Sequence, residues 1–223
     1  YHNDMNSRDT LATELNVLAD FNPVVPQDFK NAEVVMLGNL HPLVQTGVLN
    51  QMTTTPKLVV LDTMNFWMDC ALPELLEVIK RVDVITINDE EARQLSGEYS
   101  LVKAATKIQT MGPKYVVIKK GEHGALIFYT EHIFFAPALP LADVFDPTGA
   151  GDTFAGGFSG FIAQQGDISF NTMKTAIIQG SNLASFCVEK FGTERMVSLD
   201  KKEVTARLKQ FKALTQFEIE LEE

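Results

Sequence analysis

The sequence has little of what marks a secreted, membrane-spanning or nucleic-acid-binding protein. Its 223 residues include two cysteines, Cys70 and Cys187, too few for a disulfide framework, which favours a reducing cytoplasm. No apolar run reaches the ~18 residues of a membrane span, so no membrane partner is expected. Basic residues are outnumbered 19 to 29 by acidic ones, for a net charge of −10. This balance argues against nucleic acid, which favours a basic stripe.

Metal-site spacing and a recognisable N-terminal signal are also missing. His2 and His41 have no convincing metal-ligand spacing, and the first residues are neither an initiator methionine nor a signal peptide. We therefore interpret the chain as the later part of a longer protein, or as a chain without its beginning. An anionic ligand would have to be held by local features, namely backbone amides, helix ends, metal ions and a few lysines.

Short apolar runs alternate with helical patterns along most of the chain. The apolar runs are typical of buried parallel strands and cover 34–37, 58–61, 84–87 and 115–118. Helical patterns separate and follow them over 42–51, 73–81, 90–96 and 101–111. This alternation predicts an α/β fold with a doubly wound, mostly parallel sheet in Rossmann-type layers. The later pattern predicts an antiparallel hairpin from 125–129 and 132–135, then helices over 149–165, 171–190 and 201–214.

A glycine-rich stretch, Asp146–Phe158, leads from this hairpin region directly into a helical pattern. The first amides of a helix have no internal partner and lie at the positive end of its dipole, so they form an anion site. The amides of Gly149, Ala150 and Gly151 could cradle a phosphate. Asp152, at the same helix start, is suited to taking a proton from an attacking hydroxyl. The alternative is a tightly packed helix start in which Asp152 is only a solvated first-turn acid.

Residues 146–154, Asp-Pro-Thr-Gly-Ala-Gly-Asp-Thr-Phe, meet every position of the pattern D-[TP]-[TV]-G-A-G-D-x-F. The chain thereby resembles the ribokinase-like (PfkB) family of carbohydrate and nucleoside kinases. The resemblance implies a cytoplasmic enzyme that transfers the γ-phosphoryl group of ATP to a primary hydroxyl of a sugar or nucleoside. In this resemblance Asp152 is the catalytic base, and the amides of Gly149, Ala150 and Gly151 form the anion hole.

Asn88 and Glu91 follow a predicted strand and open a predicted helix. Their spacing is that of a capping box, which is one interpretation. The family has an N-x-x-E motif at this point, and the resemblance implies that Asn88 and Glu91 organise Mg²⁺ through water. The two roles can coexist, because Mg²⁺ keeps most of its waters.

Further nucleotide-site residues are implied by the resemblance. Lys119, Gly121 and Gly124 match a segment that borders the nucleotide, although a plain strand-to-hairpin turn is the alternative. Ser181 and Gly192 match positions that line the adenine pocket, but close helix packing also accounts for the small residues around Ser181. Asp146 and Thr148 match positions at which some relatives bind a monovalent cation, which leaves activation by K⁺ open.

The segment after the second predicted strand has a less certain role. Asp62 and Asn65 could face the site, whereas Phe66 and Trp67 are better explained as core.

The resemblance covers nearly the whole chain but only the later two-thirds of a typical family member. Residues 1–20 predict a strand plus connector, interpreted as the remnant of a small β lid, and 21–223 form the ribokinase-like nucleotide-binding and catalytic domain. A homodimer through the lid is left open. The first strand and the first signature, which hold the acceptor, have no match, so a sugar and a nucleoside both remain candidates. A non-catalytic nucleotide-binding regulatory protein is the alternative from another class.

Overall fold

A six-stranded sheet, in the order β1-β2-β3-β4-β5-β6, organises the residues that this computed structural model describes, 11–216 and 218. Strands β1 to β4 are parallel, and β5 and β6 are antiparallel to their neighbours. The strands are Val34–Leu37 (β1), Leu58–Asp62 (β2), Val84–Asn88 (β3), Tyr115–Lys119 (β4), Ala125–Tyr129 (β5) and His132–Ala136 (β6). Apolar, β-branched residues buried on both faces are what such central strands require.

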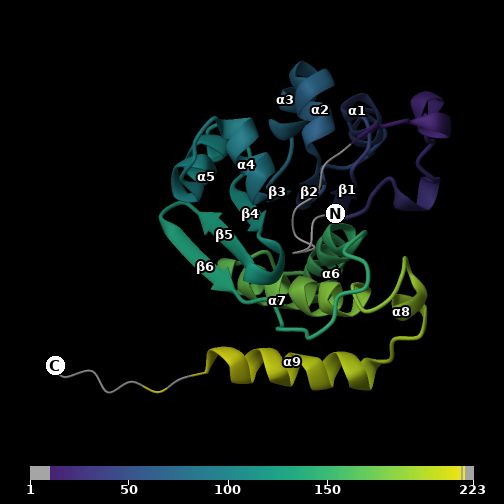
Figure 1. Ribbon diagram of the computed structural model, residues 1–223. Coiled ribbons are helices and arrows are strands. Elements are labelled where there is room, and N and C mark those ends of the chain that lie inside the picture. The colour runs from purple at the N-terminus through teal and green to yellow at the C-terminus, as the bar shows by residue number, and fades with distance from the viewer. Residues whose placement is uncertain (1–10, 217, 219–223) are drawn as a thin grey trace.

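Helices cover both faces of the sheet, as Figure 1 shows. One face is covered by α1 (Pro42–Asn50), α2 (Asn65–Cys70), α3 (Leu72–Ile79), α4 (Asp89–Ser96) and α5 (Leu101–Gln109). The other is covered by α6 (Ala150–Gln165) and α7 (Phe170–Cys187). Alternate residues of each strand feed the two cores, so that Val59 and Leu61 face α1–α5 while Leu58 and Val60 face α6 and α7.

Helices α6 and α7 pack closely because glycines meet at their contact. A β-carbon on Gly180 would lie 2.7 Å from the carbonyl oxygen of Phe154, and one on Gly157 would lie 2.9 Å from Leu183 Cδ1. Neither position has room for a side chain, so the two helix backbones approach each other directly. This contact fixes α6, whose first turn carries the glycine-rich motif.

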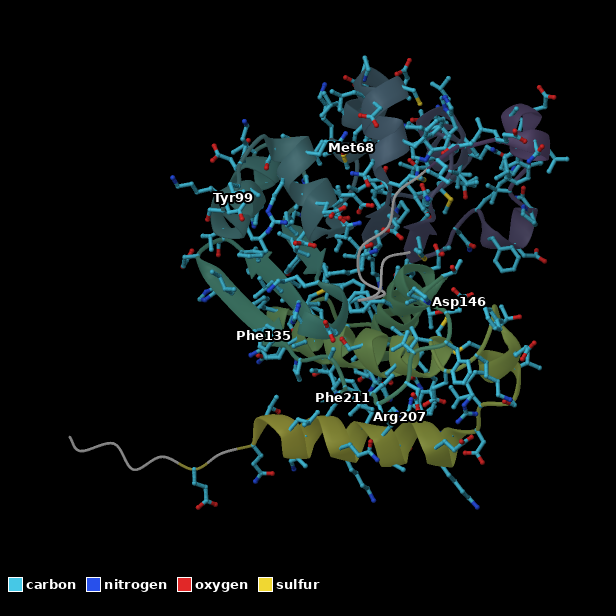
Figure 2. The ribbon with its side chains drawn as sticks, viewed as in Figure 1. Met68, Tyr99, Phe135, Asp146, Arg207 and Phe211 are labelled. Carbon is cyan, nitrogen blue, oxygen red and sulfur yellow. The ribbon has the colours of Figure 1, made fainter. Side chains whose placement is uncertain are left out.

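The C-terminal helix α9 (Lys201–Thr215) lies along the outer side of α7, after the short helix α8 (Glu194–Val197) (Figure 1). Figure 2 shows Arg207 and Phe211 on the side of α9 that faces α7. Phe211 is buried, and the Arg207 guanidinium lies 3.4 Å from the centroid of the Phe186 ring while pairing with Glu189. An aromatic anchor and a cation over a ring together hold α9 in place.

The predicted α/β fold with a mostly parallel sheet is confirmed, and the predicted helices form within a few residues of their expected ends. Of the strand plus connector predicted over residues 1–20, residues 11–20 contain a 3₁₀ helix at Asn16–Asp20 and no strand. Residues 1–10 lie outside the described residues, so the strand stays a prediction. Leu11 and Val17 are largely exposed, whereas Leu15 is partly buried and packs against the core on the side of α1–α5. Two further 3₁₀ turns occupy Gln27–Phe29 and Gly121–His123. Among the helices of residues 11–216, none combines the length and the apolar character of a membrane span.

Candidate functional site

Polar side chains gather where the parallel strands end. Asp62, Asn88 and Lys119 are the last residues of β2, β3 and β4. In the ladder Asp62 lies beside Thr86, and Asn88 lies beside Lys119. The carboxyl edge of a parallel sheet is where open α/β folds bind ligands, so we take this edge as the candidate site.

The glycine-rich motif forms the start of α6. Gly149 is the N-cap, with a φ of +80° that favours glycine. The Ala150 amide donates to the Pro147 carbonyl at 3.2 Å, and the Thr153 amide donates to the Gly149 carbonyl at 2.8 Å. These bonds close the turn and engage the Ala150 amide within it, at the positive end of α6, where a helix can bind an anion.

A buried ion pair lies against this first turn. Lys119 Nζ is 3.0 Å from Asp62 Oδ1, and the side chains of Asp62 and Lys119 are 6% and 17% exposed. The Thr86 hydroxyl donates to the same carboxylate oxygen at 3.2 Å. A β-carbon placed on Gly151 would be 3.2 Å from Lys119 Nζ. The ammonium group therefore touches the helix start that carries Gly149, Ala150 and Gly151.

Asp152 lies in the first turn of α6, and its surface is exposed to solvent. Partial burial raises the pKa of its carboxyl above the ordinary value of 3.8, and the negative charge of Asp62 raises it further. The Lys119 ammonium and the backbone amide of Asp152 oppose this rise. A carboxyl with a raised pKa holds a proton more strongly, which makes its ionised form a better general base.

Asn88 and Glu91 form a capping box at the start of α4. The Glu91 amide donates to Asn88 Oδ1 at 2.8 Å, and the Asn88 amide donates to Glu91 Oε2 at 2.7 Å. The capping interpretation is therefore confirmed, and Glu91 is only 4% exposed. Oxygen donors of this kind suit Mg²⁺ held through water. The role of Asn88 and Glu91 with the metal stays a prediction. Among the described residues, no group of three His, Cys, Asp or Glu side chains could hold a metal directly.

Asp146, Thr148 and Gly192 come together beside the end of α7. Asp146 Oδ1 accepts from the Thr148 amide at 2.9 Å, and Asp146 is labelled in Figure 2. Hydrogen bonds from Thr148, and then from the Gly192 amide, hold the pKa of the Asp146 carboxyl below its usual range. The Cys187 thiol lies 3.8 Å from the Thr148 carbonyl oxygen. The loop before α6 is thus tied to the turn that holds Gly192.

Three other residues that the sequence places near a nucleotide lie in local structures of different kinds. Gly124 has a φ of +80°, and a β-carbon there would lie 2.1 Å from the Ala136 carbonyl oxygen. Ser181 follows Gly180, the glycine of α7 that packs against Phe154. It lies about 9 Å along the helix axis from Cys187, the last residue of α7. Gly121 starts a 3₁₀ turn directly after Lys119 and Lys120. Contact of Gly121, Gly124 and Ser181 with a nucleotide stays a prediction.

The ion pair is the part of the site that sequence reasoning missed. Strand alternation could have placed its members on one face of the sheet, because Asp62, Thr86 and Lys119 all lie on the strand face that carries Val60, Val84 and Val117 toward α6 and α7. Of the residues after β2, Trp67 is buried as expected, and its Nε1 donates to Asn39 Oδ1 at 2.8 Å. Asn65 bonds to Gln94 at 2.6 Å.

Residues 4–200 match the family described as pfkB family carbohydrate kinase. A cytidine kinase of Thermococcus kodakarensis is 32% identical over 139 residues, 60% of this chain and 49% of that protein. A ribokinase of Arabidopsis thaliana is 29% identical over 137 residues, 58% of this chain and 35% of that protein. The chain therefore spans about half or less of the length of these two curated relatives.

Solved structures of the same kind are similar in fold. The structure of Arabidopsis thaliana ribokinase complexed with ribose and ATP has a TM-score of 0.68 and 26% identity, covering 84% of this chain and 61% of that one. Aminoimidazole riboside kinase from Salmonella enterica, complexed with aminoimidazole riboside and an ATP analogue, has a TM-score of 0.67 and 23% identity. That match covers 80% of this chain and 63% of that one.

Proposed function

Because this chain belongs to the pfkB family of carbohydrate kinases, we propose that it transfers the γ-phosphoryl group of ATP to a primary hydroxyl of a sugar or nucleoside. One observation carries the proposal. Asp152, a carboxyl with a raised pKa, sits in the first turn of a helix whose start is in contact with the Lys119 ammonium, which is itself paired with Asp62. A base beside an anion site is what phosphoryl transfer to a hydroxyl needs.

The reaction assigns a role to each of these groups. Asp152 takes the proton of the acceptor hydroxyl as its oxygen forms a bond to the γ-phosphorus. The bond from that phosphorus to the bridging oxygen breaks, and ADP leaves with the electron pair. The amides at the start of α6 stabilise the charge on the transferring group; they come from the N-cap Gly149, from Gly151 and from Ala150, whose amide also donates to the Pro147 carbonyl. Preorganised donors of this kind supply the larger share of the rate, and the base contributes about 10²–10⁴-fold.

Asn88 and Glu91 would hold Mg²⁺ through water, because amide and carboxylate oxygens are suitable donors. A bound Mg²⁺ supplies positive charge that offsets the charge of the phosphates. Asp146 and Thr148 offer oxygen donors for a monovalent cation such as K⁺, beside the turn of Gly192 that we assign to the adenine side. Lys119, Gly121, Gly124 and Ser181 complete the proposed nucleotide site.

The acceptor is a small molecule of the sugar or nucleoside class. The named relatives include a cytidine kinase and ribokinases, so we propose both acceptor classes for the test. The two cysteines, Cys70 and Cys187, are unpaired in the structure, in keeping with the proposed cytoplasmic location. A homodimer through residues 1–20 stays a prediction, because 1–10 lie outside the described residues.

Phosphorus NMR of Mg-ATP with a panel of sugars and nucleosides tests the proposal. We expect transfer to one acceptor, and we expect Asp152→Asn to lower turnover at least ~100-fold with nucleotide binding largely kept. Asp143→Asn, which neutralises an exposed acid on the loop before the motif, is the matched control and should keep its turnover. Near-normal turnover of Asp152→Asn would remove Asp152 from the mechanism. Nucleotide binding without transfer to any acceptor would instead favour a regulatory nucleotide-binding protein.

A further inference from the structure

The buried pair of Asp62 and Lys119 has a geometry that ordinary packing does not require. Its two charged atoms are 3.0 Å apart, and both side chains are mostly buried at the carboxyl edge of the sheet. Burying an ion pair is often no better for stability than a well-packed apolar pair. A pair of this kind, placed under the first turn of α6, therefore calls for a reason other than stability.

The carboxylate of Asp62 is held in place by its own neighbours. Thr86 donates its hydroxyl to Asp62 Oδ1 at 3.2 Å, the oxygen that also contacts Lys119. Gln45 Nε2 bonds to the backbone carbonyl of Asp62 at 3.3 Å and to that of Gly38 at 2.8 Å. Asp62 is thus fixed at both its backbone and its side chain, before any ligand arrives.

Lys119, in contrast, has a long flexible stem whose direction must be set by a partner. A free lysine side chain samples many rotamers and would extend its strongly hydrated ammonium into water. Here the contact with Asp62 holds the ammonium in one place. That place is the first turn of α6, 3.2 Å from where a β-carbon of Gly151 would be. Glycine at 151 leaves the room that the ammonium occupies.

We propose that Asp62 is a positioning residue, which holds the ammonium of Lys119 beside Gly151 so that the cation meets the phosphoryl group at the start of α6. This inference rests on the proposed function, and it goes beyond it by assigning a role to a buried carboxylate that the proposed reaction does not use. Toward the phosphoryl group Asp62 acts through Lys119, and Thr86 supports the orientation of Asp62. A cation fixed in advance loses little freedom when the phosphoryl group arrives, which is the advantage of a preorganised site.

A double-mutant cycle on the full chain separates positioning from structural support. The variants are Asp62→Asn, Lys119→Met and the double variant, assayed for transfer from Mg-ATP. A misplaced group costs up to about 100-fold in rate, so we expect Asp62→Asn to lower kcat by about 10- to 100-fold in the wild-type chain. In the Lys119→Met background the same substitution should lower kcat by less than about 3-fold, because Asp62 then has no cation to position. Equal losses in both backgrounds would overturn the inference.

Thermal stability provides the second readout, since Asp62→Asn leaves the Lys119 ammonium without its partner. Removing one member of a buried pair is destabilising, whereas replacing both is often neutral. The double variant should therefore melt at a higher temperature than Asp62→Asn, yet have no more activity. If activity instead recovers together with melting temperature, Asp62 serves only the fold. Thr86→Val, with Thr86→Ser as the conservative variant that keeps the hydroxyl, should show the loss for valine alone.

Nucleotide binding distinguishes failure of this inference from failure of the proposed function. Calorimetry with ATP and with adenosine gives the ratio of their dissociation constants for each variant. We expect the preference for ATP over adenosine to fall by the same factor in Asp62→Asn, in Lys119→Met and in the double variant, whether or not an acceptor is found. An unchanged ratio in all three would overturn the inference even in a chain that transfers phosphate. Absence of transfer in the wild type, with the ratio reduced in all three, would reject the proposed function alone.

Discussion

Replacing Gly180 by alanine should push α6 away from α7 and lower the melting temperature relative to a matched control. The new β-carbon would lie 2.7 Å from the Phe154 carbonyl oxygen and 3.1 Å from Cδ2 of the Phe154 ring. Real β-carbons essentially never approach closer than 3.0 Å, and the backbone oxygen cannot rotate away as a side chain could. The α6 backbone must therefore shift, and Asp152 is two residues from Phe154.

The magnitude follows from two opposing contributions. Alanine in a helix interior is favoured over glycine by about 1 kcal/mol, while overpacking a core contact costs about 1–3 kcal/mol. Gly160→Ala in α6 is the matched control, because it is exposed and nothing lies within 4 Å of its new β-carbon. Since both substitutions carry the same helix preference, the difference in unfolding free energy between the two variants measures the packing cost alone, about 1–3 kcal/mol.

Thermal unfolding followed by circular dichroism is the assay. For a chain of this size 1 kcal/mol corresponds to about 2–4 °C in melting temperature, so Gly180→Ala should melt about 2–12 °C below Gly160→Ala. Turnover should fall in the same variant, because the base and the first-turn amides move with α6. Equal melting temperatures, or a more stable Gly180→Ala, would refute the reasoning that these helices meet through backbone contact.

Three further outcomes follow from the structure. Because burial and Asp62 raise the pKa of Asp152 and only its ionised form accepts a proton, transfer should fall as the pH drops through that raised value. The acid limb of the pH profile of kcat/KM should therefore have an apparent pKa above 3.8. Lys119→Met should raise this apparent pKa further, because it removes the positive charge that opposes the shift. An apparent pKa at or below 3.8 would contradict this assignment. Phe211→Ala should cost about 3–5 kcal/mol in chemical denaturation, against little for Leu214→Ala, whose side chain is 48% exposed. Gly124→Ala should destabilise the chain in the same assay, because its β-carbon would overlap the Ala136 carbonyl, and an unchanged midpoint would argue against this contact.

Sequence reasoning was most reliable where one local property decides the structure. The parallel strands were predictable because runs such as Val84–Ile87 are apolar on both faces. The end of α4 was predictable because Gly97 takes a φ of +70°, which glycine adopts without strain. The start of α6 was predictable because a glycine-rich turn followed by a helical pattern has few other structures.

Prediction failed where the outcome depends on distant partners. Helix α2 was not foreseen, because it is short, its N-cap residue Met64 makes no capping bond, and it exists by packing Trp67 and Met68 into the core. The pairing of Asp62 with Lys119 joins residues far apart in the chain, across the intervening strand β3. Strand alternation gives the face on which each side chain lies, but it does not give the register. In the ladder Asp62 lies beside Thr86 and Thr86 beside Val117, so Lys119 is two residues further along and its long side chain reaches back to Asp62.

The order of the layers along the chain also matters while the protein is being made. Helices α1–α5 cover one face of the sheet as each parallel strand is added, whereas the face of Leu58, Val60, Val84 and Val117 waits for α6 and α7. At about 5–20 residues per second, the ~70 residues from β4 to the end of α7 take roughly 3–14 s to synthesise. Throughout that interval the nascent chain carries an uncovered apolar sheet face. Chaperone capture and aggregation during translation should therefore concentrate on this window, and they should ease once Gly180 meets Phe154 and α7 docks.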